Sequence, residues 1–331
     1  MQQQSSSENN YFPEKQALRK TCNRIGWMCF STNLLVAWLA SGVTLLFLLA
    51  GYPFGIYPDS IAGYQPHLYY ALTCAIYLFC LLVPMGIYLA ANRISWSVAA
   101  PHQKNGAFVF WCCVILGLSI CLLGTLPTDF TGWLMEQMGL REPTYAGGSP
   151  FGDDISINLL SIFSSTVIPA FSEELFFRGL ILGRLKKYGN IFAVLISSLL
   201  FSLYHAAMPQ MIFTFIMGLA LGLIMIRIQN IWAVMLIHAL TNGIDLLNSY
   251  LSSAFGYTIG IVVRYSIITF FVLLGILCIF LLAKKHHRFF QRRKPITHLK
   301  VSTKIGVFLF NPGIIVMTLG LIGMEIYHWL R

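Results

Sequence analysis

Long apolar runs constrain the fold of this chain more than any other feature of its sequence. Only 10% of the residues are charged, against about a quarter in an ordinary soluble domain. A helix needs roughly 20 residues to cross a bilayer, and lipid admits such runs only as helices because it offers no water to the backbone. The sequence therefore predicts an all-α, polytopic transmembrane helical bundle of about 8–9 spans. They are expected near residues 26–50, 68–91, 106–126, 155–185, 190–207, 210–228, 231–250, 259–283 and 305–330.

The positive charges of the chain gather in alternate links between these runs. Most of the 22 Lys and Arg residues fall before residue 26 and in the links 92–105, 184–187, 227–230 and 284–304. The links 51–67 and 127–154 are mainly acidic. By the positive-inside rule the N-terminus is cytoplasmic and these two links face outside. Topology and attraction to anionic membrane lipid explain the net charge of +10, so lipid is an expected partner and nucleic acid is not.

The links divide the chain into four sections. The polar start lacks the short apolar core and cleavage site of a signal peptide, which predicts a retained anchor preceded by a cytosolic N-terminal tail at 1–25. Residues 26–154 are expected to form three transmembrane helices and an external loop. Residues 155–255 hold nearly all of the polar groups inside spans and form the expected catalytic core. Residues 256–331 are expected to form C-terminal helices with a basic cytosolic link at 284–304.

Two carboxylates and a guanidinium fall inside one apolar span. In the stretch "FSEELFFRGL", Glu174 and Arg178 are four residues apart, so they share a helix face and predict a buried charge pair. Glu173 lies about 100° around the helix and can face a different partner. Pro169 lacks a backbone donor and predicts a kink. A structural Glu–Arg clamp without chemistry would explain the same motif.

Two later motifs place further polar side chains on neighbouring spans. In "FSLYH", Phe201 lies one turn before His205. In "HALTN", His238 and Asn242 share a helix face, and Asp245 lies close to that face. Taken singly, these residues could serve only as hydrogen-bonded packing between helices.

The three motifs lie at comparable depth. The helical rise places their polar groups roughly 10–22 Å from the cytosolic ends of their helices. They are therefore expected to converge on one polar catalytic cavity inside the membrane, since ionisable groups in hydrocarbon usually mark functional sites or buried pairs. A carboxylate, two imidazoles and a carboxamide suit hydrolysis of an amide by water, because the carboxylate can take the proton of the water and N–H groups can stabilise the oxyanion.

These residues carry a resemblance to a known family. The chain resembles the CPBP or Abi group of CAAX-processing and bacteriocin-processing intramembrane endopeptidases, which are similar to type II CAAX prenyl proteases. The EExxxR, FxxxH and HxxxN motifs of that group match Glu173–Arg178, Phe201–His205 and His238–Asn242, in the same order. The resemblance covers about 155–250, which is under a third of the chain.

The resemblance implies a fold, an activity and a role for each matched residue. It implies an intramembrane endopeptidase in the plasma membrane of a bacterium, which acts on a CAAX-type substrate or on a bacterial peptide or precursor. Glu173 is expected to be the general base that activates water, with His205 beside it, while His238 and Asn242 stabilise the oxyanion. Glu174 and Arg178 are expected to hold Glu173 in place. Phe201, from the FxxxH motif, and Asp245, from its spacing near the face of His238 and Asn242 and not from the resemblance, are the other expected supporting residues.

Other functions remain open at the level of the sequence. Zinc or another divalent metal could be bound by Glu173, His205 and His238, because one carboxylate and two imidazoles suit a zinc site with an open position. We favour the mechanism without a cofactor, because it explains Asn242 as an oxyanion donor. A non-enzymatic membrane immunity or regulatory protein could use the same pocket for binding. A proton-coupled transporter is disfavoured because no paired halves are visible.

Overall fold

The chain folds into a bundle of helices. The computed structural model describes residues 2–56, 60–139, 154–205, 208–287, 289–291 and 297–329, and these ranges contain helices and no β-strand. Within them, seven helical segments are long and apolar enough to cross a membrane, and a bent pair near the C-terminus makes an eighth if it forms one span. This confirms the predicted all-α, polytopic bundle, with seven or eight candidate spans in the described residues against the expected 8–9.

The longest helix begins well before the first apolar run. Helix α1 extends without a break over Gln2–Leu49, so it passes through residue 25, where the sequence places the boundary between the tail and the first span. Leu18, Cys22 and Ile25 are buried in the core. Packing of these side chains continues the helix into the polar segment, and the apolar pattern alone does not reveal it. A cytosolic location of residues 1–25 stays a prediction.

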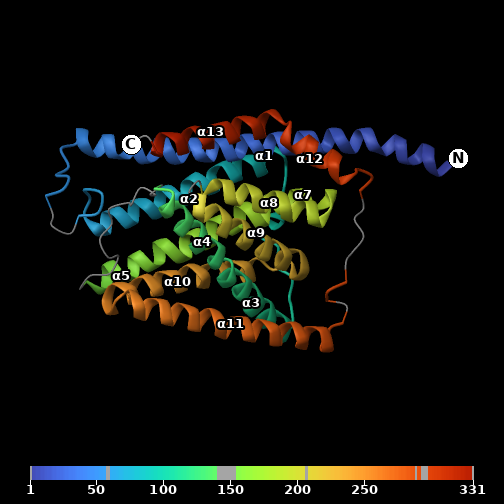
Figure 1. The fold of residues 1–331 in the computed structure, drawn as a ribbon. Coiled ribbons are helices and arrows are strands. Elements are labelled where there is room, and N and C mark those ends of the chain that lie inside the picture. The colour runs from blue at the N-terminus through green and yellow to red at the C-terminus, as the bar shows by residue number, and fades with distance from the viewer. Residues whose placement is uncertain are drawn as a thin grey trace.

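The C-terminal helices α12 (Val301–Leu309) and α13 (Pro312–Trp329) lie along α1 and form one face of the bundle (Figure 1). The two helices meet at an angle of 59°, so the run predicted at 305–330 is a bent pair. Glycines allow the close approach, since a Cβ on Gly26 would lie 2.4 Å from the backbone of Gly313.

The opposite face of the bundle is formed by α10 (Ile231–Phe255) and α11 (Tyr257–Lys285). Between the two faces lie α2 (Pro66–Ala91), α8 (Asn190–Tyr204) and α9 (Met208–Ile228). Helix α3 (Ala107–Leu123) packs against α9, α10 and α11 and leads through Gly124 into α4 (Thr125–Gln137). The link predicted as an external loop at 127–154 thus begins as helix, and its residues 140–153 lie outside the described part.

Helix α8 is shorter than the span predicted at 190–207. It has 15 residues, which rise about 22 Å, and it falls below the length that a full crossing requires. The apolar pattern continues past Tyr204, but the helix ends there with His205 as its C-terminal cap.

The span that carries the first motif is widened twice by π-helical turns. It consists of α5 (Ile155–Ile162), the π-helical η2 (Phe163–Val167), α6 (Ile168–Glu173), the π-helical η3 (Glu174–Ile181), α7 (Leu182–Leu185) and the 3₁₀ turn η4 (Lys186–Tyr188). Pro169 is the second residue after η2 and has no backbone N–H to donate. The residue before it, Ile168, donates its N–H to the carbonyl of Phe163, five residues back. Such π-turns are frequent at functional sites.

Asp154 starts this span. Its carboxylate accepts hydrogen bonds from the side chain and backbone of Ser156, which lower the pKa of Asp154. The α5 N-terminus is thereby capped.

Candidate active site

Three buried groups form an ion-pair network on η3 and α10. The Glu174 Oε1 accepts a hydrogen bond from Arg178 Nη1 at 2.7 Å and another from His238 Nδ1 at 2.8 Å. Glu174, Arg178 and His238 are each at most 2% exposed. Arg178 also lies over the ring of Phe201, 4.0 Å from its centroid, which favours a guanidinium away from water. The charge pair predicted from the four-residue spacing is present, and His238 is a third member that the spacing does not reveal.

Glu173 lies beside this network and faces a different way. Its side chain is buried, with 1% exposed, and it does not point toward lipid. The Tyr77 hydroxyl on α2 donates a hydrogen bond to Glu173 Oε1. The other oxygen, Oε2, is 3.8 Å from His238 Nε2 and has no hydrogen-bond partner among the described residues. One oxygen of Glu173 is therefore anchored and the other faces the imidazole.

His205 caps the end of α8. Its Nδ1 lies 2.9 Å from the carbonyl oxygen of Phe201, so this nitrogen carries the proton in that bond and Nε2 remains for other contacts. The Phe201 ring contacts the His205 ring at a centroid distance of 4.7 Å. Phe201 thus touches both Arg178 and His205, which gives the predicted supporting residue a physical role as a spacer between the ion pair and the imidazole.

Asn242 lies one turn after His238 on α10. Its Nδ2 donates a hydrogen bond of 3.2 Å to the carbonyl of Ser165 in η2. Because a π-turn shifts the backbone hydrogen bonds, it leaves a carbonyl free to accept from a side chain. The carboxamide has two N–H groups, so the second one is available to the neighbouring space.

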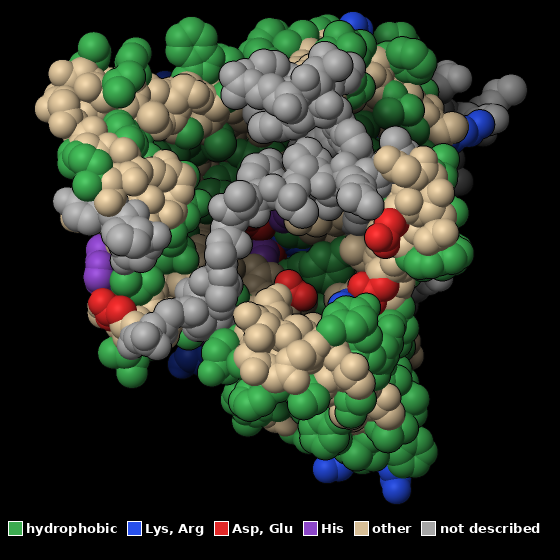
Figure 2. All heavy atoms as spheres, turned by 60° about the vertical axis from the view of Figure 1, so that its left-hand side comes forward, with side chains coloured by type: hydrophobic (Ala, Val, Ile, Leu, Met, Phe, Trp, Pro, Cys, Tyr) green, Lys and Arg blue, Asp and Glu red, His purple; other side chains and the backbone are tan. Residues whose placement is uncertain are grey.

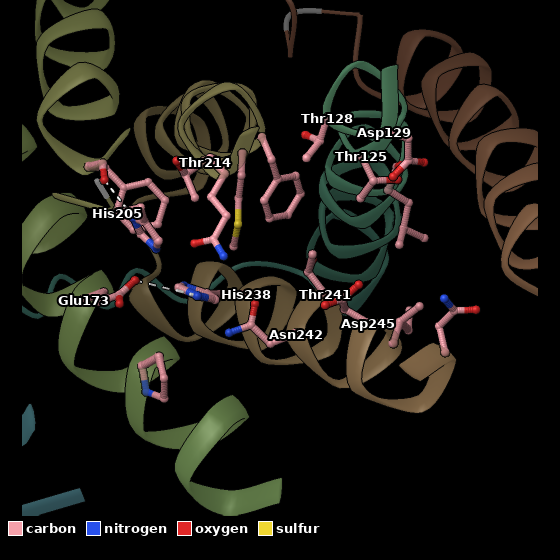
Figure 3. A pocket seen from close by; sticks show the side chains of 18 of the residues that line it. Thr125, Thr128, Asp129, Glu173, His205, Thr214, His238, Thr241, Asn242 and Asp245 are labelled. Atoms are coloured by element: carbon pink, nitrogen blue, oxygen red, sulfur yellow. Dashed lines mark hydrogen bonds and ion pairs between the residues drawn. The ribbon is translucent and has the colours of Figure 1, made fainter. Parts of the chain in front are cut away.

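All four predicted catalytic side chains line one cavity of about 480 Å³. Figure 3 shows Glu173, His205 and His238 at one end of it, with Asn242 next along α10. Asp245 lines the same cavity, but it lies at the other end beside Asp129. Asp245, which the sequence predicts as a supporting residue, therefore lies away from Glu173. Figure 2 shows the cavity as a hollow with acidic side chains around it and a histidine within.

The residues of the alternative metal site do not come together as a ligand set. Among the described residues no three His, Cys, Asp or Glu side chains are grouped to hold a metal ion. Both imidazoles use Nδ1 in other hydrogen bonds and keep Nε2 free, so these bonds alone do not exclude a metal. It is the spacing of Glu173, His205 and His238 that does not fit a metal in this arrangement.

Sequence reasoning missed three cavity residues. Tyr77 lies in an apolar span and belongs to no motif. Asp129 was expected in an external loop, but helix α4 carries it to the cavity wall, where it forms an ion pair of 2.9 Å with Arg264 of α11. The isolated Arg264 within an apolar run was the one feature that could have indicated a buried partner.

Comparison with known proteins adds an independent finding. Residues 155–244 match a family model described as type II CAAX prenyl endopeptidase Rce1-like. No curated protein and no solved structure matches the chain. The matched segment includes all three motifs and the two π-turns, and the bundle makes the chain an integral membrane protein. Residues 155–244 are therefore similar to the Rce1-like type II CAAX prenyl endopeptidases, which agrees with the resemblance that the motifs carry.

Proposed function

We propose that this protein is an intramembrane endopeptidase that hydrolyses a peptide bond with water activated by Glu173. One observation carries the proposal: the buried Glu173 has one oxygen held by Tyr77 and the other turned toward His238, at the wall of a cavity that His205 and Asn242 share. The match of 155–244 to an endopeptidase family supports it.

The anchored carboxylate provides the general base. Glu173 Oε2 takes one proton from a water in the cavity while the oxygen of that water attacks the carbonyl carbon of the substrate. His205 Nε2 is the group that orients the water. The proton then passes from Glu173 to the nitrogen of the leaving amine, and the C–N bond breaks, so the carboxylate is restored.

The oxyanion is stabilised by His238 and Asn242. The Nδ1–H of His238 is committed to Glu174, so donation from Nε2 requires the imidazolium form. That form balances the charge of the network, since Glu173 and Glu174 then face Arg178 and one imidazolium. The second N–H of Asn242 is the other donor. Glu174 and Arg178 act as supports, because they fix the ring of His238.

The setting of the reaction is part of the proposal. The distribution of Lys and Arg supports a cytoplasmic N-terminus, and we place the protein in the plasma membrane of a bacterium. The substrate is a membrane-associated peptide or protein, either of the prenylated CAAX type or a bacterial precursor. Neither a metal ion nor another cofactor takes part.

The purified full chain in lipid nanodiscs tests this function. It is incubated with prenylated and unprenylated synthetic peptides, and products are identified by mass spectrometry. Glu173→Gln keeps the shape of the side chain and removes the base, so cleavage is expected to fall at least ~100-fold. Glu136→Gln is the control, since Glu136 is an exposed carboxylate outside the cavity wall.

Cleavage by Glu173→Gln at the wild-type rate would refute the mechanism. Absence of cleavage by the wild type, with peptide binding retained, would instead favour the non-enzymatic alternative.

A further inference from the structure

The end of the cavity away from Glu173 is charged. Asp129 of α4 and Arg264 of α11 form an ion pair there, at 2.9 Å, with side chains 37% and 25% exposed. Asp245 of α10 lines the same end. Its carboxylate makes no hydrogen bond or ion pair with any residue in the described part of the chain. Among the described residues Arg264 is thus paired with Asp129, and Asp245 has no cation within ion-pair distance.

Acidic side chains outnumber basic ones along the described wall of the cavity. Its charged side chains are Asp129, Glu173 and Asp245 on the acidic side, and Arg264 with the proposed His238 imidazolium on the basic side. Glu173 contributes an independent sign that the cavity accepts a ligand, because its Oε2 is buried, has no hydrogen-bond partner among the described residues and borders this space. A cavity with low-dielectric walls strengthens the attraction for a cation. An anionic group would meet Arg264 only in competition with Asp129.

The spacing along α10 relates this charge to the reaction centre. Asp245 follows His238 by seven residues, so it lies on nearly the same helix face, about 10 Å further along the axis. An extended peptide advances about 3.3 Å per residue. A substrate that lies along α10, with its reacting carbonyl at His238, would therefore present its third residue to Asp245.

We propose that Asp245 forms a specificity subsite for a Lys or Arg side chain about three residues from the cleaved bond of the substrate. This inference rests on the proposed peptidase function and adds the chemical class of its substrate. Asp129 and Arg264 set the strength of the subsite. Arg264 lowers the attraction of Asp245 for a cation, and Asp129 restores part of it by pairing with Arg264.

Matched peptides test the subsite on the full chain in nanodiscs. The probes are fluorescent apolar peptides that carry Lys, norleucine or Glu at the third residue before or after the cleaved bond. The wild type is expected to have a KM for one Lys peptide about tenfold lower than for its norleucine partner, since charge-assisted hydrogen bonds contribute at this level. Asp245→Asn should remove this preference, so that the KM values of the Lys and norleucine peptides become equal.

Two further variants test the Lys preference, one expected to increase it and the other expected to leave it unchanged. Arg264→Gln frees Asp129 and should increase the Lys preference, whereas Glu136→Gln should leave it unchanged. Equal KM values for the Lys and norleucine peptides in the wild type would overturn the subsite, as would a preference for Glu. If the wild type cleaves no peptide, the peptidase function fails, and fluorescence anisotropy decides the subsite separately. In that assay, a Lys peptide that binds the wild type no better than Asp245→Asn overturns it.

Discussion

At the scale of single residues, the Glu173 carboxylate is held by one neighbour and left open on its other oxygen. Tyr77 donates a hydrogen bond to Oε1, while Oε2 faces the imidazole of His238 at 3.8 Å. A carboxylate with a fixed plane presents its free oxygen to water in one direction. In the proposed mechanism Tyr77 is thus a positioning residue, because it acts on the reacting groups through Glu173.

Replacement of this phenol by Phe should separate positioning from folding. Tyr77→Phe removes one hydrogen bond to a charged acceptor and keeps the ring, so kcat is expected to fall about tenfold. The KM should change little, since Tyr77 donates to Oε1 of Glu173 and leaves Oε2, the oxygen proposed to act as the base, free. Steady-state kinetics with a cleaved peptide measure both constants. Tyr69→Phe, in the same helix outside the cavity wall, is the matched control. An unchanged kcat in Tyr77→Phe would contradict the role.

The sequence predicts some of these contacts and not others, for a physical reason. Glu174 and Arg178 are neighbours on one helix, so their spacing alone places them together. The contact of Tyr77 with Glu173 joins residues 96 positions apart, and it depends on how α2 packs against α6. Asp245 follows the same face as His238, but the length of the cavity separates it from Glu173.

At the scale of elements, the π-turns and a glycine contact position the site. Glu174 and Arg178 lie within η3, and Gly179 in the same turn touches the backbone of Ala99. A Cβ at Gly179 would lie 1.8 Å from the Ala99 carbonyl oxygen. A Cβ at Gly183, four residues later, would meet the Val98 carbonyl oxygen at 3.4 Å, which is ordinary contact. Only the first of these glycines is required by the packing.

These two glycines form a matched pair of substitutions. Gly179→Ala forces η3 away from the segment around Ala99 and should destabilise the fold by about 1–3 kcal/mol. Gly183→Ala should leave stability near that of the wild type. Thermal unfolding in detergent, followed by circular dichroism, compares the two. Equal melting temperatures would show that η3 does not need this close approach.

The sequence patterns predict the positions of the helices better than they predict the π-turns within the helices or the residues at which the helices end. The apolar runs predict where most spans lie, because burial and lipid both require apolar side chains. They do not predict π-turns, since these depend on how Pro169 and the neighbouring helices redistribute backbone hydrogen bonds. The early end of α8 at Tyr204 is hidden for the same reason.

At the scale of the whole molecule, the cavity is built by helices from most of the chain. The face formed by α1, α12 and α13 contributes no described residue to its wall. Residues of α2, α4, α6, α8, α9, α10 and α11 line it, whereas the family match is limited to 155–244. The matched segment supplies the four proposed catalytic side chains, and Asp129 and Arg264 come from outside it. Substrate selection by the charged end would therefore differ between relatives that share only the matched segment.

The cofactor-free mechanism gives a prediction for the intact protein. Because Glu173, His205 and His238 are not grouped as a metal site in the described part of the chain, dialysis against EDTA or phenanthroline should leave cleavage unchanged. Elemental analysis of the purified protein should find less than one divalent metal ion per chain. Loss of cleavage after dialysis that zinc restores would reinstate the alternative in which Glu173, His205 and His238 bind a metal.

The short helix α8 also affects the surrounding lipid. Its 15 residues rise about 22 Å, against a hydrocarbon thickness of about 30 Å, and Ile191 and Leu195 reach the outside of the bundle. Acyl chains that matched the length of α8 would have to compress, at a modest cost per ångström of mismatch. A bilayer thinned in this way beside the proposed catalytic groups would shorten the path from a scissile bond near the headgroups to Glu173.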